Sequence, residues 1–202
     1  MNIVERVPVG RGGVAGAFAY IGGGLLTTVL MWFDGDLQQE LEMAETQGIQ
    51  ASAIDVILWA FHSAHHVEIE SSFERGGTTE TQSGNLFAEV STSVPKLVYY
   101  AVPVIILVVT GYLVADGALP DSTGQAIQSG AATVVGYLPV TVAARYFSEA
   151  SGSATILGEQ ISYSIAPALG TSILLAGIVF PVVLGAVGGF LWFKRAERTG
   201  RR

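Results

Sequence analysis

Residues 171–193 read TSILLAGIVFPVVLGAVGGFLWF, and the basic stretch KRAERTGRR follows at once. The first stretch is 23 residues long and carries no charge. About 20 apolar residues in a helix cross the roughly 30 Å hydrocarbon core of a bilayer, so this segment predicts a transmembrane helix. Because Lys and Arg beside a span stay in the cytoplasm, the basic tail, residues 194–202, predicts a cytoplasmic C-terminus.

The composition of the chain agrees with a membrane protein. Of the 202 residues, 50% are hydrophobic and 13% are charged, whereas soluble domains carry about 25% charged residues. The chain has no cysteine, which excludes disulfides, thiolate metal sites and cysteine nucleophiles. No nucleotide-binding, nucleic-acid-binding or hydrolase motif occurs, so we predict a protein that is not an enzyme and binds no nucleic acid.

The charged residues are strongly biased toward acids. The chain has 17 acidic residues against ten basic ones, and only Lys96 and Lys194 are lysine. An acidic, lysine-poor surface suits very high salt, which favours an origin in a halophilic archaeon. The alternative is an ordinary acidic extracytoplasmic region. Loss of folded structure below molar salt would support the halophilic interpretation.

Three further apolar segments are long enough to cross a membrane, and their only charged residue is Lys96 at the start of one of them. They are residues 12–33, residues 96–115 and the weaker segment 125–144. The first is an uncleaved anchor in our interpretation, because no small-residue cleavage site follows it. Pro103 predicts a kink in the second segment, and Pro139 predicts an interruption of the third.

Four spans with a cytoplasmic C-terminus require a cytoplasmic N-terminus. Basic residues agree with this orientation, since seven fall on the predicted inside and three on the outside. The inside residues are Arg6, Arg11, Lys194, Arg195, Arg198, Arg201 and Arg202. The outside residues are Arg75, Lys96 and Arg145. The chain therefore divides into an N-terminus with the first span (1–33), an outer segment (34–94), three more spans (95–193) and the tail (194–202).

The outer segment, residues 34–94, has eleven acidic residues and one basic residue, a net charge of −10. Within it, residues 36–48 predict a short helix and residues 53–69 a stronger, amphipathic one. Residues 71–93, rich in Ser, Thr and Gly, predict a loop, and residues 148–170 begin as a polar connection. The predicted fold is an all-α integral membrane protein, a bundle of four transmembrane helices with an extracellular insertion that carries the amphipathic helix.

All three histidines of the chain lie in this amphipathic segment, at His62, His65 and His66. On a helix, Asp55, His62 and His66 fall within about 40° of arc. The opposite, apolar face consists of Ile54, Ile57, Leu58, Phe61 and Ala64. Two imidazoles four residues apart and a carboxylate suit zinc or another divalent metal, which makes these three the candidate metal ligands. The alternatives are a helix on the membrane surface with its histidines toward solvent, and a helix whose apolar face docks on the bundle. No other cofactor is predicted.

Small residues mark the expected contacts between spans. Gly12 and Gly16 in the first span, and Gly185 and Gly189 in the last, have the four-residue spacing typical of closely packed membrane helices. The spans have no Asp, Glu, His or Lys near their midplane and no evident internal repeat. Ion-coupled carriers usually have an ionisable residue near the midplane and an internal repeat. The absence of both from these spans favours a role other than transport.

Three stretches carry a resemblance to a known family: NIVERVPV before the first span, LWAFHSAHHVEI, and LLAGIVFPVVLGAVGGFLW. The chain resembles an uncharacterised family of small haloarchaeal multi-spanning membrane proteins, sometimes labelled only "transporter". The resemblance implies a membrane location and, through that label, transport. It also implies that the histidine after Ala64 is the one typical of the family, so that His62 and His66 are particular to this chain.

Two functions are expected from these observations. The first is a non-enzymatic accessory or scaffold subunit of a membrane complex, whose glycine-lined helices and outer helix bind a partner. The second is a small transporter or channel that works as an oligomer. A histidine-metal membrane protein is a more distant third. The expected partners are the lipid bilayer and either other membrane subunits or further copies of the chain.

Overall fold

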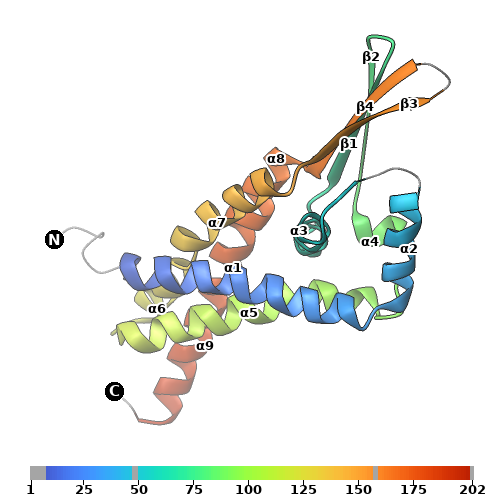
Figure 1. Cartoon of the computed structure of the whole chain (residues 1–202). Coiled ribbons are helices and arrows are strands. Elements are labelled where there is room, and N and C mark those ends of the chain that lie inside the picture. The colour runs from blue at the N-terminus through green and yellow to red at the C-terminus, as the bar shows by residue number, and fades with distance from the viewer. Residues whose placement is uncertain (1–7, 47–49, 157–158, 201–202) are drawn as a thin grey trace.

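The computed structural model describes residues 8–46, 50–156 and 159–200 (Figure 1). Arg6, Arg201 and Arg202, which were counted among the predicted cytoplasmic residues, lie outside this range. The described part is mostly helical and contains four helical segments long and apolar enough to cross a membrane, as the sequence predicts. They are α1 (Val9–Trp32), α5 (Lys96–Ala118), α6 with α7 (Thr123–Ala131 and Val134–Phe147), and α8, η2 and α9 (Leu169–Thr171, Ser172–Val179 and Phe180–Arg198).

The break in the third candidate span lies six residues before the place that the sequence suggested. The prediction that Pro139 interrupts it is wrong, because α7 continues through this residue. The chain turns instead at Ala132 and Thr133, between α6 and α7. There the Thr133 hydroxyl donates to the Gly130 carbonyl (2.8 Å), a local bond that competes with the helical backbone pattern.

The structure also contains a four-stranded antiparallel sheet, so the prediction of an all-α fold is wrong. Strands β1 (Ile69–Arg75) and β2 (Thr78–Gly84) form a hairpin where residues 71–93 predicted a loop. Strands β3 (Ala150–Ile156) and β4 (Glu159–Pro167) form a second hairpin in the predicted polar connection. Because β1 pairs with β4, the strand order is β2-β1-β4-β3. The first and third connections between candidate spans therefore meet in one sheet, away from the start of α1 and the end of α9 (Figure 1).

The first hairpin has a sequence signal that the segment's composition obscured. Gly76 and Gly77 connect its strands with φ of 57° and 80°, and two successive positive φ angles are typical of a two-residue type I′ turn. A Gly-Gly pair between two strands is a recognised hairpin signal. The flanking strands consist largely of Ser, Thr and Glu, so the apolar alternation expected of a half-buried strand is weak.

The insertion also contains α2 (Gly35–Thr46), α3 (Ala53–Ala64) and α4 (Leu86–Glu89). The short helix predicted over residues 36–48 is confirmed by α2, and residues 47–49 lie outside the described range. α3 begins in a capping box: the Ser52 hydroxyl accepts the Asp55 backbone N–H (3.3 Å), and the Asp55 carboxylate accepts the Ser52 N–H (2.7 Å).

α3 ends five residues earlier than the predicted helix 53–69. The Val67 N–H donates to the His62 carbonyl (3.2 Å), and the His66 N–H donates to the Ser63 carbonyl (2.9 Å). These two bonds form a Schellman motif, which requires His66 at positive φ, here 60°. Glycine usually occupies this position, so the sequence contained no ordinary stop signal.

The candidate spans pack through glycine at the end of the bundle away from the sheet. A side chain at Gly12 or Gly16 would overlap the backbone around Ala132 and Thr133. Gly185 and Gly189 similarly lie against the backbone of α6. All four glycines that the sequence marked as packing positions are therefore at contacts between helices, where the backbones approach closely.

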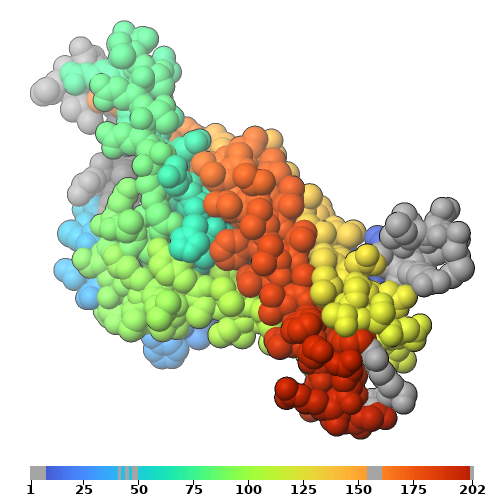
Figure 2. Space-filling view, turned by 180° about the vertical axis from the view of Figure 1, so that it is seen from behind, coloured from blue at the N-terminus to red at the C-terminus, as the bar shows by residue number. Residues whose placement is uncertain are grey.

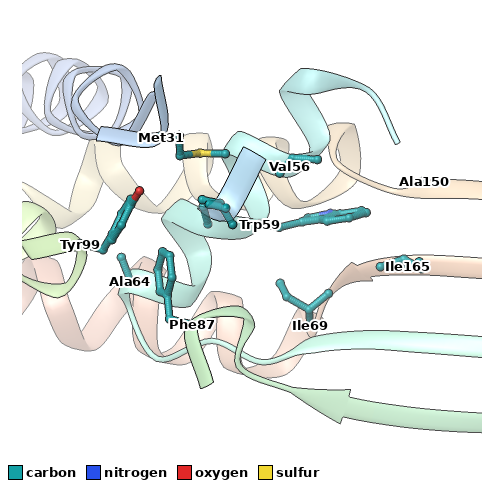
Figure 3. Close-up of a cluster of buried hydrophobic side chains, with 11 residues drawn as sticks. Met31, Val56, Trp59, Ala64, Ile69, Phe87, Tyr99, Ala150 and Ile165 are labelled. Atoms are coloured by element: carbon teal, nitrogen blue, oxygen red, sulfur yellow. The ribbon is translucent and has the colours of Figure 1, made fainter. Parts of the chain in front are cut away.

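Toward the sheet, the bundle opens and α3 fills the opening. Figure 1 shows α3 between the pair α1 and α5 and the segment formed by α7 and α8. Seen from behind, the chain around the end of α3 lies between α5 and η2 (Figure 2). A hydrophobic cluster joins α3 to the base of the sheet, with the Trp59 ring extending toward Ile165 and with Phe87 stacked on Tyr99 at 4.6 Å (Figure 3).

Candidate functional site

Four deeply buried titratable side chains lie together where α3 meets α1 and α7. They are His62 and His65 at the end of α3, Tyr20 of α1 and Tyr137 of α7, and we call them the His–Tyr cluster. The exposed fractions of His62 and His65 are 1% and 0%. An aromatic contact joins the two tyrosines, whose ring centroids are 5.1 Å apart.

Phe61 positions α3 in the bundle. A Cβ at Gly23 of α1 would overlap the Phe61 ring, so this glycine makes room for it. The ring also makes edge contacts with Tyr20 (5.1 Å) and His65 (4.8 Å). Because Phe61 is fully buried, it brings the adjacent His62 and the following turn into the interior.

His65 has a hydrogen-bond partner for each ring nitrogen. Its Nδ1 lies 2.7 Å from the Phe61 carbonyl, which only accepts, so Nδ1 carries the proton. Its Nε2 therefore accepts the hydroxyl of Tyr137 (2.7 Å). Burial lowers the pKa of His65 to about 3, and a neutral ring with both nitrogens engaged joins α3 to α7.

His62 has one hydrogen bond of good geometry, and the Thr141 backbone also lies close enough to affect its pKa. Its Nδ1 donates to the Leu58 carbonyl (2.9 Å), which leaves an acceptor lone pair on Nε2. Among the described residues, neither His62 Nε2 nor the Tyr20 hydroxyl has a hydrogen-bond partner, and the two ring centroids are 6.2 Å apart. Burial and, to a smaller extent, the nearby positive charge of Arg145 lower the pKa of His62 to about 4.

The three candidate metal ligands have separate surroundings. Asp55 belongs to the capping box at the start of α3, and His62 points into the bundle. His66 is exposed and stacks on Tyr100 of α5, with ring centroids 4.7 Å apart. Within residues 8–46, 50–156 and 159–200, no group of three His, Cys, Asp or Glu side chains is placed to hold a metal ion.

The surface-helix alternative is wrong for His62 and His65, which do not meet solvent. α3 does dock on the bundle, as the other alternative proposed. The face that it buries is rotated about the helix axis from the predicted apolar face. Phe61 of the predicted apolar face is buried, whereas Ile54 of the same face is 63% exposed. Helical periodicity alone could not show this, because bundle helices surround α3 on several sides and also bury Asp55 and His62 of its polar stripe.

The two tyrosines of the cluster were not predicted from the sequence. Tyr20 and Tyr137 lie inside uncharged segments, where they counted only as apolar residues. A signal was present, since a hydroxyl in the middle of a candidate span needs a partner. The spans themselves have no histidine near their midplane, as noted, but α3 brings two histidines in from the insertion.

A family match covers residues 2–195. The chain belongs to DUF7978, a family of unknown function. The matched region of this DUF7978 chain includes three candidate spans in full, the fourth as far as residue 195, both hairpins and every residue of the His–Tyr cluster. No curated protein and no solved structure matches the chain.

Acid is expected to destabilise this DUF7978 protein through His62 and His65. Both are neutral when folded, with pKa values of about 4 and about 3, and regain an ordinary pKa of about 6.5 when unfolded. Between these values the unfolded chain binds more protons, so the free energy of unfolding falls as the pH falls from 6.5. At about 1.4 kcal/mol per unit for each histidine, the loss by pH 4.5 is at most about 5 kcal/mol.

Thermal unfolding in detergent between pH 4.5 and 7.5 measures this effect. We expect the double variant His62→Gln, His65→Gln to have a flatter profile than the parent above pH 5, where few carboxylates bind protons. Equal slopes in parent and variant would show that other groups cause the acid sensitivity.

Proposed function

We propose that this protein is a non-enzymatic, multi-pass membrane protein that acts as an accessory subunit of a membrane complex. In this proposal the four candidate spans cross the bilayer with both termini in the cytoplasm. The sheet projects from the opposite side and contacts a partner protein. The basic residues Lys194, Arg195 and Arg198 at the end of α9 support this orientation. We also propose that the protein works in high salt, as its acidic composition suggests.

The outer half of the sheet is the observation that carries this proposal. Its two faces differ. Ser, Thr and Glu occupy one face, whereas Phe73 and Tyr163 lie on the side that packs on the core nearer the base of the sheet. Phe73 is 36% exposed, and the hairpin of β1 and β2 projects from the body of the molecule (Figure 2). Antiparallel sheets usually pack one face on a core. On the same side, Glu80 pairs with Phe73 and Arg75 follows two residues later, so the exposed aromatic ring is flanked by charged residues. An aromatic ring with a polar rim suits contact with another protein.

The edge strand β2 offers a second means of contact. It pairs with β1 on one side only, so its other side presents backbone N–H and C=O groups. Its described side chains are exposed up to Gly84. A partner strand could extend the sheet there through backbone hydrogen bonds.

The His–Tyr cluster supports a structural role within the same proposal. His65 engages both ring nitrogens and is neutral over the physiological range, so it holds α3 in place and does not carry protons there. The close glycine contacts likewise favour a fixed arrangement of the spans.

Native purification in molar salt, followed by mass measurement, tests the proposal. We expect a complex with a second protein at fixed stoichiometry. We also expect Phe73→Ser to lower retention of that protein at least tenfold, because it removes the exposed aromatic ring. Thr79→Ala, on the polar face of the same hairpin, is the matched control and should retain it. If the parent, Phe73→Ser and Thr79→Ala all formed the same closed homo-oligomer, the accessory role would be contradicted.

A small oligomeric transporter or channel is the second candidate. The unpartnered His62 Nε2 and Tyr20 hydroxyl favour it, since polar groups inside a membrane bundle often mark a path for solutes. In that case the homo-oligomer is the expected species, and loss of solute flux in Tyr20→Phe would support it.

A further inference from the structure

A groove of about 650 Å³ lies between α1, α3 and α7. At one end of it, α1 and α7 touch, because Gly16 and Gly136 allow their backbones to meet. At the other end, α3 holds the same two helices apart. The groove is thus a consequence of how α3 is wedged into the bundle.

The groove follows the two candidate spans lengthwise. Its wall on α1 runs from Tyr20 to Thr28, and its wall on α7 runs from Val140 to Phe147. On each helix the lining residues recur at intervals of three and four, which is one face over two turns, about 10 Å. The two helices run in the same direction, so a bound molecule would lie parallel to both.

The lining is apolar, and its few polar side chains are already engaged or turned inward. The Thr28 hydroxyl donates to the Gly24 carbonyl (2.9 Å), and the Ser52 hydroxyl donates to Asp55 (2.7 Å). The hydroxyl of Tyr20, the third polar side chain of the lining, is buried. Such a surface favours hydrocarbon and gives a polar solute nothing to bind.

Small residues create the depth of the groove. A Cβ at Gly24 would meet no atom within 4 Å, and Ala143 faces the groove from α7. A larger side chain at either position would therefore fill the groove without displacing the backbone.

We propose that the groove binds one hydrocarbon chain of a bilayer phospholipid, extended along α1 and α7. The headgroup lies at the end marked by Ser52, toward the sheet. The lining continues the outward apolar faces of the helices, since Leu25 is 63%, Ile54 63% and Phe147 78% exposed. In a bilayer such faces meet lipid tails, which are as apolar as these side chains, and a hydrocarbon chain extended along both spans follows the direction of the groove. This inference rests on the membrane location in the proposed function.

The experiment compares lipid retained by four proteins. Parent, Gly24→Leu, Ala143→Phe and the control Gly124→Leu are reconstituted in palmitoyl-oleoyl-phosphatidylglycerol vesicles, extracted in mild detergent and weighed by native mass spectrometry. Gly124 in α6 is a matched control because its added Cβ also meets no atom within 4 Å and it does not line the groove. We expect one retained phospholipid on the parent and the control, and at least tenfold less on the two groove variants.

Equal retention by all four proteins would overturn the inference, as would a parent that retains no phospholipid. A free fatty acid or a second polypeptide in place of the phospholipid would also overturn it. Flotation with the vesicles separates this failure from failure of the proposed function. A chain that does not float is not a membrane protein, whereas a floating chain without retained lipid contradicts only the groove.

Discussion

Replacing Gly185 with leucine is expected to prevent the bundle from assembling. Gly185 of α9 lies between Gly111 of α5 and Gly130 of α6, with backbone against backbone on both sides. A side chain there would overlap the Gly130 carbonyl and must push α6 away from α9, while the backbone of α5 limits movement on the other side. Overpacking usually costs about 1–3 kcal/mol, and displacement of rigid backbone lies above that range, so we expect a loss of at least about 4 kcal/mol.

The thermal unfolding midpoint in detergent and the yield of monodisperse protein measure this loss. Gly124→Leu makes the same substitution in α6 without a clash and should unfold within a few degrees of the parent. If Gly185→Leu unfolded at the same temperature as Gly124→Leu, the close contact of the three helices would be wrong.

The second large effect is expected at Asp34, immediately after α1. This carboxylate is fully buried and accepts the Tyr99 hydroxyl (2.9 Å) and the Ser93 N–H (2.8 Å). It also accepts the Leu37 N–H (3.2 Å), which starts α2. Asp34 thus joins the first candidate span, the insertion and the start of α5.

Asp34→Ala leaves these donors without their acceptor. Each unsatisfied buried donor costs about 1–3 kcal/mol, and with partial access of water we expect a total loss of about 3–4 kcal/mol. Asp36→Ala is the control, because Asp36 is exposed and only begins α2, which is worth about 1 kcal/mol at most. Chemical unfolding in detergent compares the two variants. Equal midpoints for them would mean that Asp34 does not hold these segments together.

Asp34 also shows a limit of reading charge from the sequence. It belongs to the acidic outer segment, and its charge helped to place that segment outside the membrane. Its side chain is nevertheless buried and bonded to segments about 60 residues away. Charge counts predicted the side of the membrane for the whole segment and could not predict which carboxylate is structural.

The candidate site was predicted in part. The histidines stood out because all three lie within five residues, but the metal hypothesis assumed one continuous helix to residue 69. His66 ends the helix at positive φ, a conformation that a non-glycine residue adopts only when several contacts favour it. Tyr137 reaches His65 from 72 residues further along the chain, and no local pattern joins the two.

By itself, the sequence determined the four long apolar helices, the basic end of α9 and the glycines at the helix contacts. These features depend on length, hydrophobicity and spacing within one segment, which any stretch of the chain displays without its neighbours. Only the tertiary structure decided that two polar connections pair as one sheet, because β1 and β4 lie about 90 residues apart and their Ser- and Thr-rich strands are stabilised by backbone pairing. It also decided that α3 enters the bundle and buries His62 and His65, because that position depends on the space left by Gly23 and on the hydroxyl of Tyr137.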